Sequence, residues 1–263
     1  MFPSKRVGLA LSGGGALGAA HIGVLEVLQE HGVRPCCIAG TSAGSAVGVA
    51  YCAGMSLERM KEIALNLQWT KLGRVVRPRY GFFDGSRLEQ YLIELIGDRT
   101  FDQLNIPLAV AAVDILTEEL VILREGHVAP AVRASCAFPG VFTPVELEGR
   151  LLVDGGLLNN MPVAVLREMG GEYLIAVDLL LSVVPRKPPA TLLEMWFLSL
   201  FTLMRATHHE GQQADIVIRP KVGEFGGIDF VNVPRLIERG RQAAEAAMPH
   251  ILHDLGREGN FAG

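Results

Sequence analysis

Residues 6–44 read RVGLALSGGGALGAAHIGVLEVLQEHGVRPCCIAGTSAG and contain two strand–loop–helix units in succession. The apolar run Arg6–Leu11 is typical of a buried strand, and Ala16–His31 has the length and composition of a helix. A second short strand, Cys36–Ala39, precedes a second helix of small residues, Ala43–Ala53. Strands that alternate with helices in this way indicate an α/β fold.

The same alternation continues to the end of the chain. Further strands are expected at Pro107–Ile115, Leu120–Arg124, Val145–Glu148, Leu151–Val153, Tyr173–Leu179 and Asp215–Arg219. Further helices are expected at Arg87–Ile96 (opened by a capping box of Ser86 and Glu89), Pro162–Met169, Ala190–Gln213 and Pro234–Leu255. No internal repeat is visible, and the linker-like Pro185–Pro189 is too short to separate two domains. We therefore expect one domain over residues 1–263.

The composition is that of a folded protein without a dominant charge. Hydrophobic residues make up 49% of the 263 positions, and 24 Lys and Arg face 28 Asp and Glu, for a net charge of -4. These values exclude a disordered chain and give no basic field for nucleic acid. Four cysteines, Cys36, Cys37, Cys52 and Cys136, fit neither a disulfide framework nor a zinc site, so we expect buried thiols in a reducing compartment.

No segment of the sequence is expected to span a membrane. The charge-free stretch Val7–Leu25 is broken by three glycines, and Pro35–Leu57 is rich in Gly, Ser and Thr. The most apolar segment, Met195–Met204, is too short to cross a bilayer. We interpret it as a deeply buried helix, with a membrane-docking or acyl-chain surface and a homo-oligomer interface as alternatives. A cytoplasmic protein is expected, with peripheral contact to a membrane surface left open.

The glycine-rich loop of the first unit can bind an anion. Successive glycines at Gly13, Gly14 and Gly15 let the backbone turn sharply, and the helix that follows adds unpaired N–H groups. The spacing from Gly13 to Gly18 also matches a dinucleotide fingerprint, but residues 38–42 lack the acidic residue that would hold a ribose. No Gly-Lys-Ser/Thr follows, so the P-loop interpretation fails as well. The loop suits a phosphate or an oxyanion, or glycines that serve close packing alone.

The second unit contains the pattern G-x-S-x-G. In Gly40-Thr41-Ser42-Ala43-Gly44, the serine lies between a predicted strand and a predicted helix, which is the context of a nucleophile elbow. A serine needs an adjacent base, and histidine is the usual one. The downstream histidines are His127, His208, His209, His250 and His253. None of them lies in a distinctive loop after a strand.

An aspartate offers a second candidate for the base. Residues Leu151–Gly156 read as a strand that enters a tight Asp154-Gly155-Gly156 turn. The aspartate could be an ordinary turn residue, because Asp-Gly is a common turn pair. To act as a base, its carboxylate must reach the Ser42 hydroxyl through the fold. Its weak basicity must also be offset by desolvation and by stabilisation of the oxyanion.

Three blocks of sequence together resemble the patatin-like phospholipase family, especially its small bacterial members: Gly13–Gly18, Gly40–Gly44 and Asp154–Gly156. The resemblance extends to Ala20–Leu25, Ala134-Ser135, Pro139-Gly140, Phe142–Val145, Asn159–Pro162 and Ala214–Pro220, and so covers nearly the whole chain. It implies a three-layer α/β fold with a central, mostly parallel sheet between helices. It also implies hydrolysis of acyl esters of lipids, with no metal or other cofactor.

The resemblance further implies a role for each matching residue. Ser42 would be the nucleophile and Asp154 its base, without a histidine. The N–H groups of Gly13, Gly14 and Gly15 would form the oxyanion hole.

One position departs from the family. Many members carry Arg or Lys where this chain has Leu17, so the oxyanion hole would lack that cation. This departure leaves an alternative from another class, a regulatory or lipid-binding module of the same fold with weak or no activity. A nicotinamide-dependent oxidoreductase is disfavoured because the acidic residue of the dinucleotide fingerprint is missing.

Overall fold

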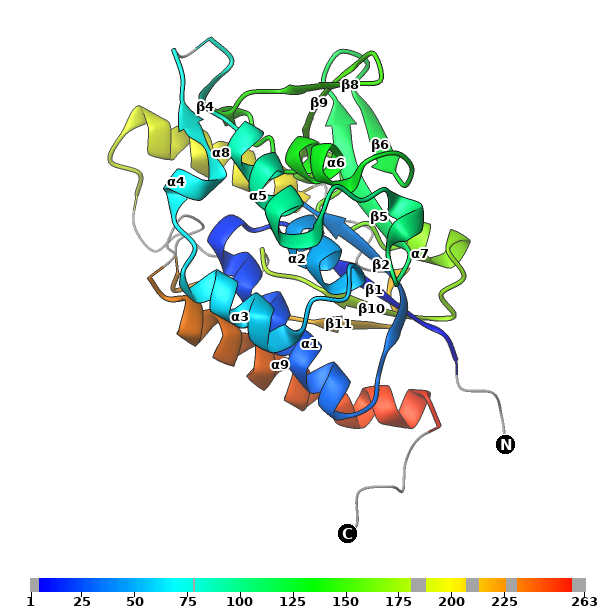
Figure 1. Cartoon of the computed structure of the whole chain (residues 1–263). Coiled ribbons are helices and arrows are strands. Elements are labelled where there is room, and N and C mark those ends of the chain that lie inside the picture. The colour runs from blue at the N-terminus through cyan, green and yellow to red at the C-terminus, as the bar shows by residue number, and fades with distance from the viewer. Residues whose placement is uncertain (1–4, 78, 181–187, 207–212, 226–230, 257–263) are drawn as a thin grey trace.

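The computed structural model describes residues 5–77, 79–180, 188–206, 213–225 and 231–256. Within these residues an eight-stranded sheet forms the centre, with the strand order β11-β10-β1-β2-β5-β9-β8 and with β6 beside β5 (Figure 1). Strands β11, β10, β1, β2 and β5 run parallel to one another, whereas β6 and β9 run antiparallel to β5, and β8 antiparallel to β9. The strands are β1 Val7–Leu11, β2 Pro35–Thr41, β5 Leu108–Asp114, β6 Glu119–Leu123, β8 Val145–Leu147, β9 Arg150–Asp154, β10 Tyr173–Val177 and β11 Ile216–Ile218.

Helices cover both faces of the sheet, so the molecule has three layers, as the family resemblance implies. The longer helices are α1 Ala19–Glu30, α2 Ala43–Cys52, α3 Leu57–Leu65, α5 Ser86–Ile96, α6 Val128–Ser135, α8 Leu192–Ala206 and α9 Val233–Asp254. Side chains of β1 alternate between two cores. Leu9 and Leu11 pack with α1, α2 and α9, whereas Ala10 packs against the short helix α7, Ala164–Glu168. Both faces of β1 are thus buried, which is why its sequence is apolar throughout.

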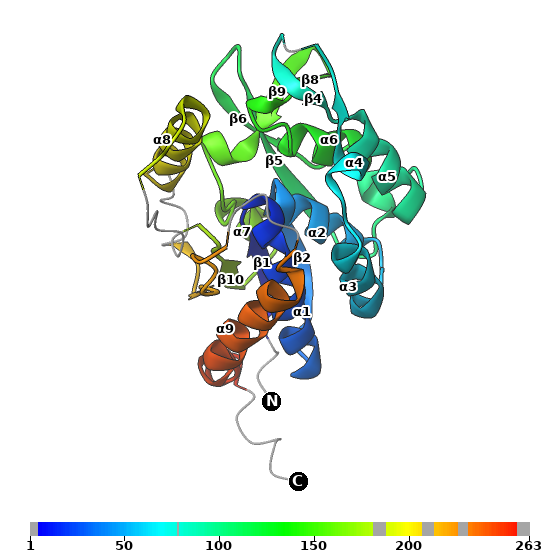
Figure 2. The same ribbon diagram turned by 90° about the vertical axis from the view of Figure 1, so that its left-hand side faces the viewer.

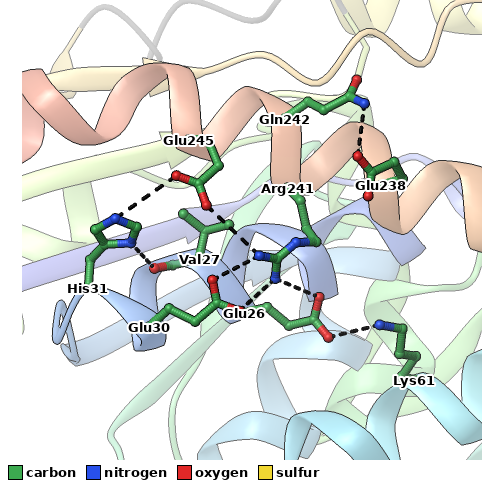
Figure 3. Close-up of polar contacts among 9 residues, drawn as sticks. All are labelled: Glu26, Val27, Glu30, His31, Lys61, Glu238, Arg241, Gln242 and Glu245. Carbon is green, nitrogen blue, oxygen red and sulfur yellow. Dashed lines mark hydrogen bonds and ion pairs between the residues drawn. The ribbon is translucent and has the colours of Figure 1, made fainter.

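Helices α1 and α9 cross at very short range. A Cβ atom on Gly23 would collide with the carbonyl of Ile237, and one on Gly240 with the carbonyl of Ala20. Figure 3 shows the polar contacts beside this crossing. The Arg241 guanidinium donates to both carboxylate oxygens of Glu30 at 2.8 Å and to Glu26 at 3.3 Å. Glycines and one arginine therefore fix α9 on α1.

A smaller sheet lies at one end of the molecule. Among the described residues it has three strands, β3 Arg74–Val75, β4 Gly81–Asp84 and β7 Gly140–Phe142. Strands β3 and β4 form a hairpin, which in both views lies at the same end of the molecule as β8 and β9 (Figures 1 and 2). Beside this sheet, Arg133 of α6 donates to Asp84 of β4 and Glu89 of α5.

The structure corrects several expectations on secondary structure. The predicted capping box is wrong, because helix α5 begins at Ser86 itself, and the Asp84 carboxylate accepts the Ser86 N–H at 3.0 Å. Before α1, residues Gly15–Gly18 form the 3-10 helix η1. The long helix expected at Ala190–Gln213 is described as α8 over Leu192–Ala206, and positions 207–212 lie outside the described residues. In the part of the chain that the model describes, no helix has the length and apolarity needed to cross a bilayer.

Candidate active site

Ser42 occupies a strained turn between β2 and α2. Its backbone has φ 51° and ψ −123°, in the region of positive φ that L-residues rarely adopt. Such a conformation costs about 1–3 kcal/mol and persists only where the surroundings hold it. Small neighbours make the turn possible. A Cβ atom on Gly40 would lie 2.7 Å from the backbone of Gly44, and one on Gly44 would collide with the carbonyl of Leu11.

Hydrogen bonds from three segments hold the turn. The N–H of Ser42 donates to the Ser135 hydroxyl at 2.8 Å, and that hydroxyl donates to the Ala111 carbonyl at 2.6 Å. The Thr41 hydroxyl donates to the Asn159 carbonyl at 3.0 Å. Sequence analysis gave Ser135 no role, although it lies in a block that carries the family resemblance. Its place at the end of α6 links the turn to strand β5.

The register of three strands explains how Ser42 meets Asp154. Strand β6 pairs with Val110–Asp114 along one edge of β5. Strands β2 and β9 therefore share the other edge, with Thr41 opposite Ala111 and Asp154 opposite Ala112. The carboxyl ends of β2 and β9 thus meet head to head. At this junction the Ser42 side chain lies close enough to the Asp154 carboxylate to lower its pKa, and Oδ1 of this carboxylate accepts the N–H of Gly156 at 2.9 Å.

Burial adjusts the acidity of the aspartate. Asp154 is 1% exposed, and this burial raises the pKa of its carboxyl from an ordinary 3.8 to about 6. The hydrogen bonds from Gly156 and Ser42 lower the pKa and offset part of the effect. A base is most effective when its pKa lies close to the working pH. The carboxylate is therefore a better proton acceptor than an exposed aspartate would be.

The glycine loop lies directly against the nucleophile turn. A Cβ atom on Gly13 would lie 3.1 Å from Cβ of Ser42 and 2.6 Å from the side-chain oxygen of Asn160. The N–H of Gly13 donates to that same oxygen at 3.1 Å. The Gly13 amide is thus directed at Asn160. Because the Gly13 amide already has an acceptor, Gly14 and Gly15 are the stronger candidates among the three expected oxyanion donors.

Gly14 and Gly15 stand at the N-terminal end of η1. The first N–H groups of a helix have no acceptor within the helix and so can serve an anion. Leu17, the departure from the family, is 2% exposed and lies in the core. The remaining motif glycine, Gly155, packs on β5, where a Cβ atom would collide with the Ala111 carbonyl.

A cysteine that sequence analysis treated as a buried thiol touches the same place. The Cys136 thiol lies beside Ser42 and Ser45, and close enough to Asp154 to be affected by its charge. Burial and that carboxylate raise the thiol pKa to about 12. Cys136 is therefore neutral and protonated at physiological pH, and it places an uncharged group beside the Ser42 hydroxyl and the Asp154 carboxylate.

The described histidines lie elsewhere. His127 bonds Asp98 at 2.8 Å on the surface, and His253 bonds Asp254. His21 is fully buried, with Nε2 2.8 Å from the Ser12 carbonyl, and burial lowers its pKa to about 4. None of these bonds reaches Ser42 or Asp154, and His208 and His209 lie outside the described residues.

Helix α8 borders the site with apolar side chains. Met204 is buried and fills the space beside Gly156, which follows Asp154. Further along the helix, the Phe201 ring stacks on Phe138 at 5.7 Å between centroids. The other side of α8 is open, with Leu192, Met195 and Leu203 exposed by 88%, 50% and 54%. Of the side chains that the structure describes in Met195–Met204, only Met204 is buried, so the interpretation of this segment as a deeply buried helix is wrong.

The sequence of the chain matches a model of the patatin-like phospholipase family over residues 9–167. The chain belongs to this family. Relatives include two NTE family proteins of Mycobacterium tuberculosis that are described as uncharacterised. One is 37% identical over 67% of this chain and 49% of its own length, and the other is 32% identical over 93% of this chain and 46% of its own length. The patatin-like chain thus spans about half the length of these relatives.

The fold is found in solved structures as well. VipD from Legionella pneumophila superposes with a TM-score of 0.67 over 96% of this chain and 67% of the VipD chain, at 16% sequence identity. A likeness at this identity establishes the fold. The patatin-like α/β fold expected from the sequence motifs is therefore confirmed.

Proposed function

We propose that this patatin-like protein is a lipid acyl hydrolase that cleaves fatty-acyl esters through an acyl-enzyme on Ser42. Asp154 accepts the proton of the Ser42 hydroxyl while the oxygen attacks the ester carbonyl. The N–H groups of Gly14 and Gly15 stabilise the oxyanion that forms. Asp154 returns the proton to the departing alcohol. It then deprotonates a water molecule that attacks the acyl-enzyme, and passes this proton to the Ser42 oxygen as the fatty acid leaves.

The single observation that supports this mechanism most is the contact at the strand junction. Ser42, on a strained turn, lies beside a buried carboxylate whose pKa is raised to about 6. Strain of this kind is typical of functional sites. A merely structural aspartate would be expected to keep a low pKa.

The substrate class follows from the surroundings of the dyad. Met204 lies against Gly156, and Phe201 and Trp196 continue the apolar side of α8 toward Phe138. An apolar wall beside the reacting carbonyl favours a long acyl chain over a small, polar ester. We also propose that the enzyme works on lipid at a membrane surface and needs no metal, since proton transfer and oxyanion stabilisation both come from protein groups.

Active-site labelling tests the nucleophile. A fluorophosphonate probe should label the wild-type protein and the Ser56→Ala variant, whose lost hydroxyl caps helix α3 far from the dyad. Ser42→Ala should take up no label and should not hydrolyse p-nitrophenyl butyrate. Asp154→Asn should lower hydrolysis by a factor of about 10³ or more, because the hydroxyl loses its base.

Circular dichroism and thermal melting confirm that each variant is folded. A folded wild-type protein without labelling or turnover would favour the regulatory module that sequence analysis left open. Labelling that persists in Ser42→Ala would show that the nucleophile is another residue.

A further inference from the structure

The β3–β4 hairpin carries an unusual surface for a chain with net charge -4. Three exposed arginines, Arg74, Arg77 and Arg79, lie within it, and in the described residues only Arg74 has an acidic partner, Asp84 at 3.8 Å. Between and beside them stand apolar side chains that are largely open to solvent: Val75, Tyr80 and Phe82 are exposed by 76%, 61% and 49%. Cations and exposed aromatic groups are thus combined in one short segment.

The hairpin is connected to the candidate active site by direct packing. Strand β4 pairs with β7, where Gly81 lies opposite Gly140. A Cβ atom on Gly140 would lie 2.5 Å from the Trp196 ring of α8, and Met204 near the other end of α8 contacts Gly156. Helix α8 therefore runs from the base of the hairpin to the Asp154 turn. The exposed Leu192, Met195 and Leu203 lie along this helix.

The hairpin lies at one end of the molecule in both views (Figures 1 and 2), and its exposed side chains are open to a surface that meets this end. Arginines attract a negatively charged surface, while tyrosine and phenylalanine prefer the interface between lipid head groups and hydrocarbon. A second copy of the chain is a poorer partner, because a two-fold interface would bring the same arginines together. We propose that the hairpin docks the protein on an anionic lipid bilayer, and that α8 leads lipid from this surface to Ser42.

This inference rests on the proposed function only in naming the bilayer as the source of substrate. Binding is therefore measured in the Ser42→Ala background, in which lipid cannot be hydrolysed through the proposed nucleophile. The probe is sucrose-loaded vesicles of phosphatidylcholine, alone or mixed 7:3 with phosphatidylglycerol, sedimented in 0.1 M salt. Failure of the dyad would appear in the labelling experiment, and failure of docking would appear here.

We expect sedimentation with the mixed vesicles and little with phosphatidylcholine alone. A basic residue at an anionic surface contributes roughly fivefold to binding, so Arg77→Ser with Arg79→Ser should weaken binding about 30-fold. Tyr80→Ser with Phe82→Ser leaves the charge unchanged and should weaken it roughly tenfold or more. The matched control removes two exposed cations after β11, by Arg219→Ser with Lys221→Ser, and should bind like the parent.

Three results would overturn the proposal. The parent protein could sediment equally with both kinds of vesicle, or with neither. The control pair could lose as much binding as the arginine pair. Light scattering could show that the parent is a dimer which the hairpin substitutions dissociate, in which case the hairpin is a contact between copies.

Discussion

Asp154 must be ionised to accept a proton, but its burial disfavours the ionised form. The pKa of this carboxyl therefore determines how activity depends on pH. Burial raises the pKa of the carboxyl to about 6, so the fraction of active base falls as the pH drops below that value. We expect kcat/KM for p-nitrophenyl butyrate to be roughly tenfold lower at pH 5 than on a plateau above pH 7. A profile that stays flat down to pH 4 would mean that Asp154 is not the base.

The same burial makes ionised Asp154 unfavourable for stability. Because its pKa is higher in the folded protein than the ordinary 3.8, the carboxyl favours folding at low pH. This contribution is lost as the pH rises through about 6. Asp154→Asn should therefore be more stable than wild type at pH 8, by up to roughly 3 kcal/mol, and similar to it below pH 4. Urea unfolding at both pH values measures the difference, and a variant that is less stable at pH 8 would contradict it.

Ser135 has a positioning role that one substitution can test. In Ser135→Ala the partly buried N–H of Ser42 and the Ala111 carbonyl both lose the Ser135 hydroxyl as a partner. We expect a loss of about 1–3 kcal/mol in the free energy of unfolding and slower fluorophosphonate labelling of Ser42. Ser86→Ala, at the start of α5, should leave the labelling rate unchanged. Unaltered labelling in folded Ser135→Ala would show that the turn holds Ser42 without this bond.

At the scale of elements, the sequence predicts the positions of the strands better than it predicts their pairing and register. The apolar runs of β1, β5 and β10 are recognisable because both faces of each strand are buried. The head-to-head junction of β2 and β9 is not recognisable, since it depends on which part of β5 each strand pairs with. Motif and family resemblance thus suffice to propose Ser42 and Asp154 as a pair, but the strand register is needed to explain why the two residues lie near each other.

Short or atypical elements escaped prediction for physical reasons. Strands β3, β4 and β7 have two to four residues each, too few for a periodic pattern. Helix α6 was missed because Pro130 stands in its first turn, where the missing N–H is harmless, although proline usually marks a loop. The roles of Ser135 and Asn160 depend on contacts with distant strands and loops, which local sequence does not encode.

The α1–α9 crossing offers a test of an interaction between elements. Arg241 forms a two-bond contact with Glu30, at 2.8 Å for each bond, and its side chain is only 28% exposed. In a double-mutant cycle of Arg241→Met and Glu30→Gln, we expect a coupling energy of about 1 kcal/mol that falls in 1 M NaCl. The Arg59–Glu62 pair within α3 serves as a control, with a coupling of about 0.3–0.5 kcal/mol. Equal coupling for both pairs would mean that the bidentate contact adds nothing to the crossing.

For the whole molecule, the distribution of burial predicts how stability is distributed. The central strands β1, β5 and β10 are buried at every position, whereas β3 is exposed and β4 only partly buried. Regions with few buried contacts open at lower free energy than the core. The hairpin and the smaller sheet should therefore behave as a mobile attachment on a rigid centre, which suits a segment that has to adapt to a surface.

Hydrogen exchange followed by mass spectrometry measures this directly. We expect peptides that cover β1, β5 and β10 to remain protected for hours, and the peptide that covers residues 74–84 to exchange within seconds to minutes. Anionic vesicles added to the Ser42→Ala protein should slow exchange in residues 74–84, because docking excludes water from the hairpin, and should leave the central strands unchanged. Uniform protection across both sheets would remove the distinction between centre and attachment. Slowing confined to the segment after β11 would place the lipid contact at the opposite edge of the large sheet.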